Sequence, residues 1–110
     1  MVLCLALSYG GRDEIADACR AIAAAVQAGR IAVNDIDATV VAAHLYAPHA
    51  ADVDLVVRTA AEQRLSNFLP WQTTYAEYVS LPVLWPDMAA ADLHVALCEY
   101  QGRERRFGAV

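Results

Sequence analysis

The sequence contains no lysine, and it has no pair of cysteines at the spacing of a metal site. All eight basic residues are arginines. The sequence also has thirteen acidic residues, so the formal net charge is −5. A nucleic-acid-binding domain would show a basic face, and this charge balance argues against one. Arginine suits bidentate recognition of phosphate or carboxylate, although codon bias in a GC-rich genome also explains a preference for arginine over lysine.

The cysteines are few and scattered, which excludes a disulfide framework. Cys4, Cys19 and Cys98 lie far apart within apolar patterns, and we expect buried free thiols in a reducing compartment. The first nine residues lack a basic stretch and are too short for a signal peptide or a membrane span. We therefore expect a cytoplasmic chain.

Apolar residues, by contrast, are abundant. They make up 58% of the 110 residues, whereas a soluble domain usually has roughly 45–50%. Either a partner covers part of the apolar surface of this small chain, or its many alanines inflate the count. The composition leaves both explanations open.

The N-terminal part predicts a strand, a glycine turn and a helix. Residues 2–9 form a continuous apolar run that ends at Gly10 and Gly11, which is typical of a buried strand in a parallel sheet. Apolar residues at helical spacing follow over residues 15–26, with acidic residues before them and Gly29 as the stop signal.

The remainder continues the alternation of strands and helices, which predicts an α/β fold with a mostly parallel sheet and flanking helices in one domain, residues 1–110. Ligands bind such sheets at the carboxyl ends of the strands, here residues 10–12 and 58–66. The predicted elements are a short helix capped by Asn34 or Asp37 and ended by Pro48, a strand over residues 53–58, an aromatic helix over 68–78 with Pro70 in its first turn, an extended segment over 79–85, and a helix over 89–106 with Leu93, Ala96, Leu97 and Tyr100 on its inner face.

The second of these strand ends carries a candidate anion site. Arg58 ends the strand, Arg64 lies on the following loop, and Ser66 is placed to cap the next helix. Two guanidinium groups, a hydroxyl and helix N–H groups suit a diphosphate better than a carboxylate, because a diphosphate has more oxygens to bond. The alternative is ordinary ion pairing, of Arg58 with Glu62 or of Arg64 with Asp54 or Glu62.

Few other residues point to chemistry. Glu77 is either a solvated surface carboxylate or a ligand of magnesium, which one or two carboxylates bind together with substrate phosphates. His44, His49 and His94 are scattered, and we interpret them as surface or core histidines.

Several motifs together resemble one family. The series Arg-Thr-x-x-Glu-x-Arg-x-Ser-Asn-Phe-Leu-x-Trp-Gln over residues 58–72, then Tyr-x-Glu at 75–77 and Leu-Trp-Pro-Asp at 84–87, resembles the C-terminal signature of the cis-prenyltransferases, the family of undecaprenyl diphosphate synthase. Residues 7–15 resemble the family's sheet strand and glycine turn, and residues 103–108 resemble its Arg-x-Gly ending. The resemblance covers nearly the whole chain and implies the C-terminal part of that fold.

The resemblance implies an isoprenyl transferase that condenses isopentenyl diphosphate with an allylic diphosphate such as farnesyl diphosphate. It also implies a homodimer or heterodimer and a peripheral membrane contact. By the same resemblance Glu77 would bind Mg²⁺. The residues expected to hold the diphosphate of isopentenyl diphosphate are Arg58, Arg64, Leu65 and Ser66, and Arg106 and Gly108 would reach the active site across the dimer.

Two departures from the family pattern matter. The family usually has glycine where this chain has Ala60-Ala61, and alanine would strain a turn that needs a positive φ. The family's Asp-Gly-Asn loop for the allylic substrate is absent from these residues. We therefore expect the chain to be inactive by itself. Alternative roles are a non-catalytic partner subunit and an inactive remnant.

Overall fold

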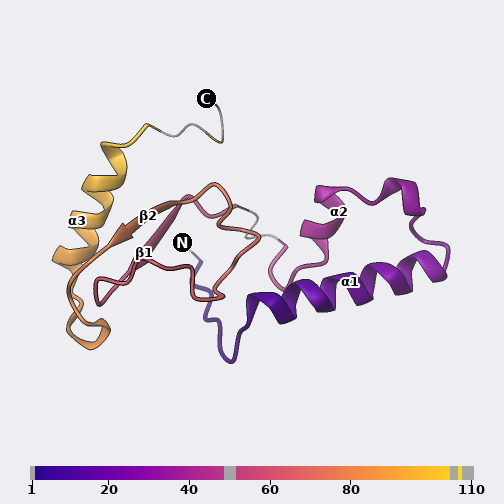
Figure 1. Cartoon of the computed structure of the whole chain (residues 1–110), viewed down its shortest axis with the longest axis horizontal. Helices are drawn as coiled ribbons and strands as arrows, with labels where there is room; N and C mark the ends of the chain where they lie inside the picture. Colours follow the sequence, from indigo (N-terminus) through magenta and orange to yellow (C-terminus); the bar gives the residue numbers. More distant parts are fainter. Residues whose placement is uncertain (1, 49–51, 105–106, 108–110) are drawn as a thin grey trace. The chain divides into compact units, whose positions relative to one another are not determined.

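In the computed structural model, residues 2–48, 52–104 and 107 are described (Figure 1). The chain divides into two units, which we take in turn. The first unit holds residues 1–51 and 67–71, and the second holds residues 52–66 and 72–110.

Helix α1, Gly11–Gln27, is the main element of the first unit (Figure 1). It confirms the predicted helix, with acidic residues in its first turn and a glycine stop. Beyond the C-cap residue Ala28, Gly29 has a φ of +71°, which lets the chain leave the helix. The buried positions recur every three or four residues and are Gly11, Glu14, Ala18, Ile22 and Ala25.

The N-terminus of α1 is closed by Asn67, which is far away in the sequence. The Asn67 carbonyl oxygen accepts a hydrogen bond from the Gly11 N–H at 2.9 Å, and its Oδ1 accepts one from the Arg12 N–H at 3.0 Å. A Cβ atom at position 11 would lie 2.0 Å from Cδ of Pro70. The predicted glycine turn is thus a place where two backbone segments approach closely.

The chain returns along α1 through a short 3₁₀ helix η1, Val33–Asp35, and helix α2, Ala38–Ala43. Of the two predicted caps, Asp37 is the one used, since its Oδ1 accepts from the Val40 N–H at 2.9 Å. The helix ends at Ala43, before Pro48 is reached, so the prediction that Pro48 ends it is wrong.

A buried carboxylate holds this unit together. Glu14 is 1% exposed, and it accepts hydrogen bonds from the Tyr46 N–H at 2.9 Å and from the Tyr9 hydroxyl. Such bonds offset the cost of burying a charged group. Burial and the bond to Glu14 raise the pKa of Tyr9 above its ordinary range.

The apolar run over residues 2–9 does not form the predicted strand. Val2, Leu3, Leu5 and Leu7 each remain at least 73% exposed. A strand needs a neighbour for its N–H and C=O groups, and the described residues supply no strand that pairs with this run. The prediction of a buried strand is therefore wrong for this structure.

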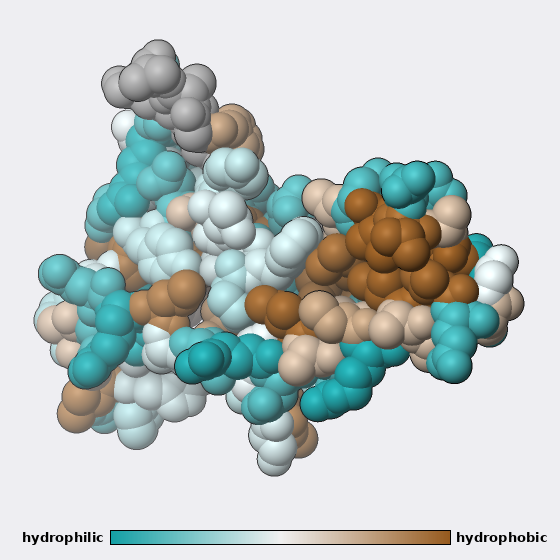
Figure 2. All heavy atoms as spheres, turned by 45° about the vertical axis from the view of Figure 1, so that its right-hand side comes forward, coloured by the Kyte–Doolittle hydropathy of each residue, from teal (hydrophilic) through white to brown (hydrophobic). Residues whose placement is uncertain are grey.

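Apolar side chains also gather on the surface of the first unit. Figure 2 shows them over the part of the chain that carries α1 and α2. Val33 and Ile36, between these helices, are 67% and 39% exposed. Part of the apolar excess of the sequence therefore lies outside the core.

The second unit contains a parallel pair of strands, β1, Leu55–Arg58, and β2, Glu77–Ser80. In their register Leu55 faces Glu77 and Arg58 faces Ser80. β1 lies within the predicted strand, and β2 begins two residues before the predicted extended segment. Parallel strands with flanking helices confirm the α/β class.

The aromatic helix predicted over residues 68–78 is wrong, since turns occupy most of this segment before β2 begins. Leu69 has a φ of +50°, outside the right-handed helical region. Farther along, the Gln72 carbonyl accepts from the Val53 N–H at 3.0 Å, so the backbone bonds to the residues before β1.

The last elements are the 3₁₀ helix η2, Trp85–Asp87, and helix α3, Ala90–Gln101. α3 ends at the C-cap Gly102, earlier than the predicted end at residue 106. Of the predicted inner face, Ala96 is buried, but Leu93 and Leu97 are exposed. The core of the unit consists of Val79, Leu81 and Ala96, with Leu55, Val57, Val83 and Met88 packed against it.

Candidate functional site

Arg58 and Arg64 come together at the carboxyl end of β1. Arg58 is the last residue of β1, and its Nη1 donates a hydrogen bond to the backbone carbonyl of Arg64. The loop over residues 59–64 thus folds back to the strand end. This is the position at which α/β sheets bind ligands.

Arg64 is also paired with a carboxylate, as the ion-pair alternative predicts. Its Nε and Nη2 donate to the two oxygens of Glu62 at 2.5 and 2.8 Å. These bonds lower the pKa of Glu62 and raise the pKa of Arg64. The pair with Glu62 uses the N–H of Nε and one N–H of Nη2, and a guanidinium has further N–H donors. The pair therefore orients the Arg64 side chain and leaves donors that can bond an anion.

The loop between the two arginines has a positive φ at the two positions where the family usually has glycine, as the sequence predicts for this turn. Ala60 and Ala61 have φ angles of +57° and +53°, in the left-handed region where a side chain is strained. Their N–H groups donate to the carbonyls of Val83 and Leu81 at 2.8 and 2.9 Å. These two hydrogen bonds hold the strained turn in place.

The other predicted substrate residues lie on the same loop. Leu65 and Ser66 follow Arg64 and are both exposed. Ser66 has a φ of +25° and does not cap a helix, because no helix follows it in the described residues up to Trp85. Arg106 and Gly108 fall outside the described residues.

Glu77 lies at the opposite end of the strand pair from Arg58. It opens β2 opposite Leu55, so three residue steps of about 3.3 Å separate it from the level of Arg58. Its Oε2 accepts from Nη1 of Arg103 at 3.0 Å, and Nη2 of Arg103 donates to Glu99. Both bonds raise the pKa of Arg103.

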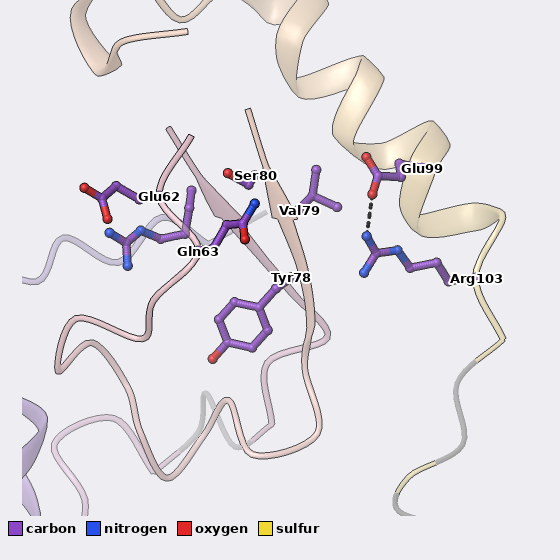
Figure 3. A pocket seen from close by; sticks show the side chains of 8 residues that line it. Glu62, Gln63, Tyr78, Val79, Ser80, Glu99 and Arg103 are labelled. Carbon is purple, nitrogen blue, oxygen red and sulfur yellow. Dashed lines mark hydrogen bonds and ion pairs between the residues drawn. The ribbon is translucent and has the colours of Figure 1, made fainter. Parts of the chain in front are cut away.

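Arg58 and Arg103 line one cavity of about 290 Å³ within the second unit. Figure 3 shows the eight lining side chains and the bond between Arg103 and Glu99. The lining combines charged, neutral polar and apolar side chains and comprises Arg58, Glu62, Gln63, Tyr78, Val79, Ser80, Glu99 and Arg103. The volume lies near the lower end of the range for small-ligand sites.

Glu77 by itself provides an incomplete site for Mg²⁺. Among the described residues there is no group of three or more His, Cys, Asp or Glu side chains that could hold a metal ion. Mg²⁺ is commonly bound by one or two carboxylates together with substrate phosphates. Glu77 therefore fits as a single carboxylate ligand only where phosphate oxygens complete the set and Arg103 gives way.

Of the remaining candidates, His49 falls outside the described residues, and the other two histidines have neighbours within hydrogen-bond reach. Nδ1 of His44 lies 2.8 Å from the Val40 carbonyl, and Nε2 of His94 lies 3.7 Å from Sγ of Cys98. All three cysteines are free, as predicted, but they are exposed, so the expectation of buried thiols is wrong. No helix in the described part of the chain is long and apolar enough to cross a membrane.

Comparison with known proteins decides the family. The family model for undecaprenyl diphosphate synthase (Prenyltransf) matches residues 1–108. The chain belongs to this prenyltransferase family. The resemblance drawn from the motifs at residues 58–72, 75–77 and 84–87 is thereby confirmed.

Relatives of this prenyltransferase chain are considerably longer. It is 54% identical to the bifunctional protein CrtB/UppS of Streptomyces coelicolor, over 98% of this chain and 19% of the relative. It is 49% identical to isoprenyl transferase 2 of Bradyrhizobium diazoefficiens, over 98% of this chain and 43% of the relative. It also superposes on the structure of lavandulyl diphosphate synthase from Lavandula x intermedia in complex with dimethylallyl diphosphate, with a TM-score of 0.87 and 44% identity. That superposition covers 94% of this chain and 45% of the lavandulyl diphosphate synthase chain. The chain thus spans less than half of each.

Sequence reasoning missed the part played by Arg103, which it considered within the ending over residues 103–108. The spacing of Glu99 and Arg103, four residues apart, was an available signal for an ion pair on a helix. The bond from Arg103 to Glu77 crosses 26 residues and had no such signal.

Proposed function

We propose that this chain is the isopentenyl-diphosphate-binding portion of a cis-prenyltransferase that condenses this substrate with an allylic diphosphate such as farnesyl diphosphate. Membership of the family supports the reaction class. The chain spans less than half of its relatives, so the allylic site would come from another part of the enzyme.

The contact between Arg58 and the Arg64 carbonyl is the observation that supports the substrate site best. It brings the Arg58 guanidinium to the backbone of Arg64 at the carboxyl end of β1, with the Arg64 guanidinium bonded to Glu62 on the same loop. Charge-assisted hydrogen bonds from arginine to phosphate are short, strong and frequently bidentate. Arg58 and Arg64 would bind the diphosphate, with Leu65 and Ser66 beside it on the exposed loop.

Glu77 would contribute one carboxylate to a bound Mg²⁺, which neutralises phosphate charge and steadies a leaving diphosphate. The single carboxylate and the missing Asp-Gly-Asn loop support a further proposal, that this chain alone makes no product. A dimer, with Arg106 and Gly108 near the active site, and a cytoplasmic location remain predictions.

Calorimetry with isopentenyl diphosphate and Mg²⁺ tests the substrate site. We expect weak binding to the wild-type chain. Arg64→Ala should weaken binding about 10-fold to 100-fold, because hydrogen bonds to charged groups contribute about 1.5–3 kcal/mol. Arg20→Ala is a matched control, since the Arg20 side chain is 74% exposed against 76% for Arg64 and is likewise paired with a neighbouring carboxylate.

Equal affinity in the wild type and in Arg64→Ala would contradict the assignment of the site. An equal loss in Arg20→Ala would show that any arginine suffices, and would contradict it as well. A separate assay with radiolabelled substrates should yield no polyprenyl diphosphate from this chain. Polyprenyl diphosphate made by the chain alone would show that the chain is a complete enzyme, and would overturn our proposal that it holds only part of the active site.

A further inference from the structure

Arg103 occupies the carboxylate that the proposed function assigns to a metal. Its Nη1 lies 3.0 Å from Oε2 of Glu77, and its Nη2 donates to Glu99 on the last turn of α3. One guanidinium therefore lies between two carboxylates, one on β2 and one on α3. The Arg103 guanidinium is thus bonded to the same carboxylate that, under the proposed function, would bind Mg²⁺.

The pair is more sheltered than the ion pair of Arg64 with Glu62. The side chains of Arg103 and Glu77 are 34% and 25% exposed, against 76% and 33% for Arg64 and Glu62. Ion pairs shielded from water are screened less by salt. Arg103 thus competes with a divalent cation more effectively than a fully solvated arginine would.

The fold places Arg103 so that it reaches Glu77. α3 ends at Gly102, and Arg103 is the next residue, with its side chain four residues beyond Glu99. The bond to Glu99 steadies the guanidinium toward β2 and toward the cavity that Arg58 also lines (Figure 3). Arginine is suited to this position because its fork bonds two acceptors at once.

From this geometry we infer that Arg103 is a latch on Glu77, so that the guanidinium and a divalent cation bind this carboxylate in mutual exclusion. The inference rests on the proposed function, which assigns Glu77 to the metal. Binding of the cation breaks the Arg103–Glu77 hydrogen bond and leaves Arg103 bonded to Glu99. The latch keeps the Glu77 charge compensated until cation and substrate phosphates arrive together.

A titration with Mn²⁺ in the presence of a fixed concentration of isopentenyl diphosphate tests the latch without any measurement of activity. The diphosphate is included because Glu77 fits a metal only where phosphate oxygens complete the ligand set. Mn²⁺ broadens the NMR signals of nearby amides, so its affinity is read at residues 77–80 of the ¹⁵N-labelled full chain. Arg103→Gln should bind Mn²⁺ at Glu77 about threefold or more tightly than the wild type, a factor within the range of single partly exposed ion pairs. Arg103→Lys, which keeps the charge and loses the fork, should lie between the two.

Two further variants make the result specific. Arg20→Gln removes an arginine of equal charge from an exposed pair with Asp17, and should leave Mn²⁺ affinity unchanged. Glu77→Gln should abolish the broadening. The amide spectrum of each variant shows whether it is folded. If Arg103→Gln does not fold, the comparison of Mn²⁺ affinity between the wild type and Arg103→Lys still tests the latch.

The possible results separate the latch from the proposed function. Equal Mn²⁺ affinity in the wild type, Arg103→Gln and Arg103→Lys, with loss in Glu77→Gln, would overturn the latch and leave the metal role of Glu77 intact. Absence of broadening around Glu77 in the wild type and in both Arg103 variants would overturn that metal role, and the latch with it. A gain in Arg20→Gln as large as that in Arg103→Gln would show a general charge effect and overturn the latch.

Discussion

Replacing Ala60 and Ala61 by glycine should stabilise this chain, although glycine usually weakens a fold. Both alanines have φ angles in the left-handed region, +57° and +53°. The hydrogen bonds of this turn use backbone N–H groups, to the carbonyls of Val83 and Leu81, and glycine keeps both. The substitution therefore removes the Cβ strain and leaves the contacts unchanged.

The size of the effect follows from two opposing terms. A residue with a Cβ atom costs about 1–2 kcal/mol in the left-handed conformation. Glycine loses more conformational freedom on folding, at a cost of about 0.5–1 kcal/mol. The difference is a gain of about 0.5–1 kcal/mol at each position, or about 1–2 kcal/mol for Ala60→Gly with Ala61→Gly.

Urea denaturation followed by circular dichroism measures this gain. The matched control is Ala21→Gly, the same chemical change at an exposed position inside α1, which should cost about 1 kcal/mol. The two changes should thus shift the unfolding midpoint in opposite directions. A double variant that is destabilised like Ala21→Gly would refute the claim that the turn is strained.

Two further predictions concern the glycine turn and the Arg64 loop. Gly11→Ala should destabilise the chain by about 1–3 kcal/mol, because its Cβ would lie 2.0 Å from Pro70 Cδ, whereas Gly102→Ala, with 3.5 Å to the nearest backbone oxygen, should be close to neutral; equal denaturation midpoints would contradict this. The pKa of Glu62 is lowered by Arg64, so this pair stabilises the folded chain above the ordinary carboxyl pKa, and the contribution is lost as the pH falls through the lowered value. A ¹³C NMR titration should show the Glu62 pKa rising in Arg64→Gln, and an unchanged pKa would disprove the coupling.

The contact between Arg58 and Arg64 was predictable from the sequence because the two residues are close together along the chain. Arg58 ends a strand, and Arg64 lies six residues later, so one loop brings them together. The pairing of Arg64 with Glu62 was among the stated alternatives, since the two are neighbours on that loop. The strain at Ala60 and Ala61 followed from a departure from the family pattern.

The failed predictions involve segments whose structure depends on distant partners. The apolar run over residues 2–9 has a strand's composition, yet a strand forms only where another strand pairs with it. The aromatic segment over residues 68–78 has helical spacing, but turns with a left-handed Leu69 occupy it, followed by β2. Local propensity is a weak prior that tertiary contacts override.

By itself the sequence determined the family, the helix α1 with its glycine stop and the strand β1, because these depend on neighbouring residues. Only the tertiary structure decided that Asn67 closes the N-terminus of α1 and that Arg103 holds Glu77. Those contacts join residues 55 and 26 positions apart. No periodicity or motif encodes such pairs, since they exist only once separate elements have packed together.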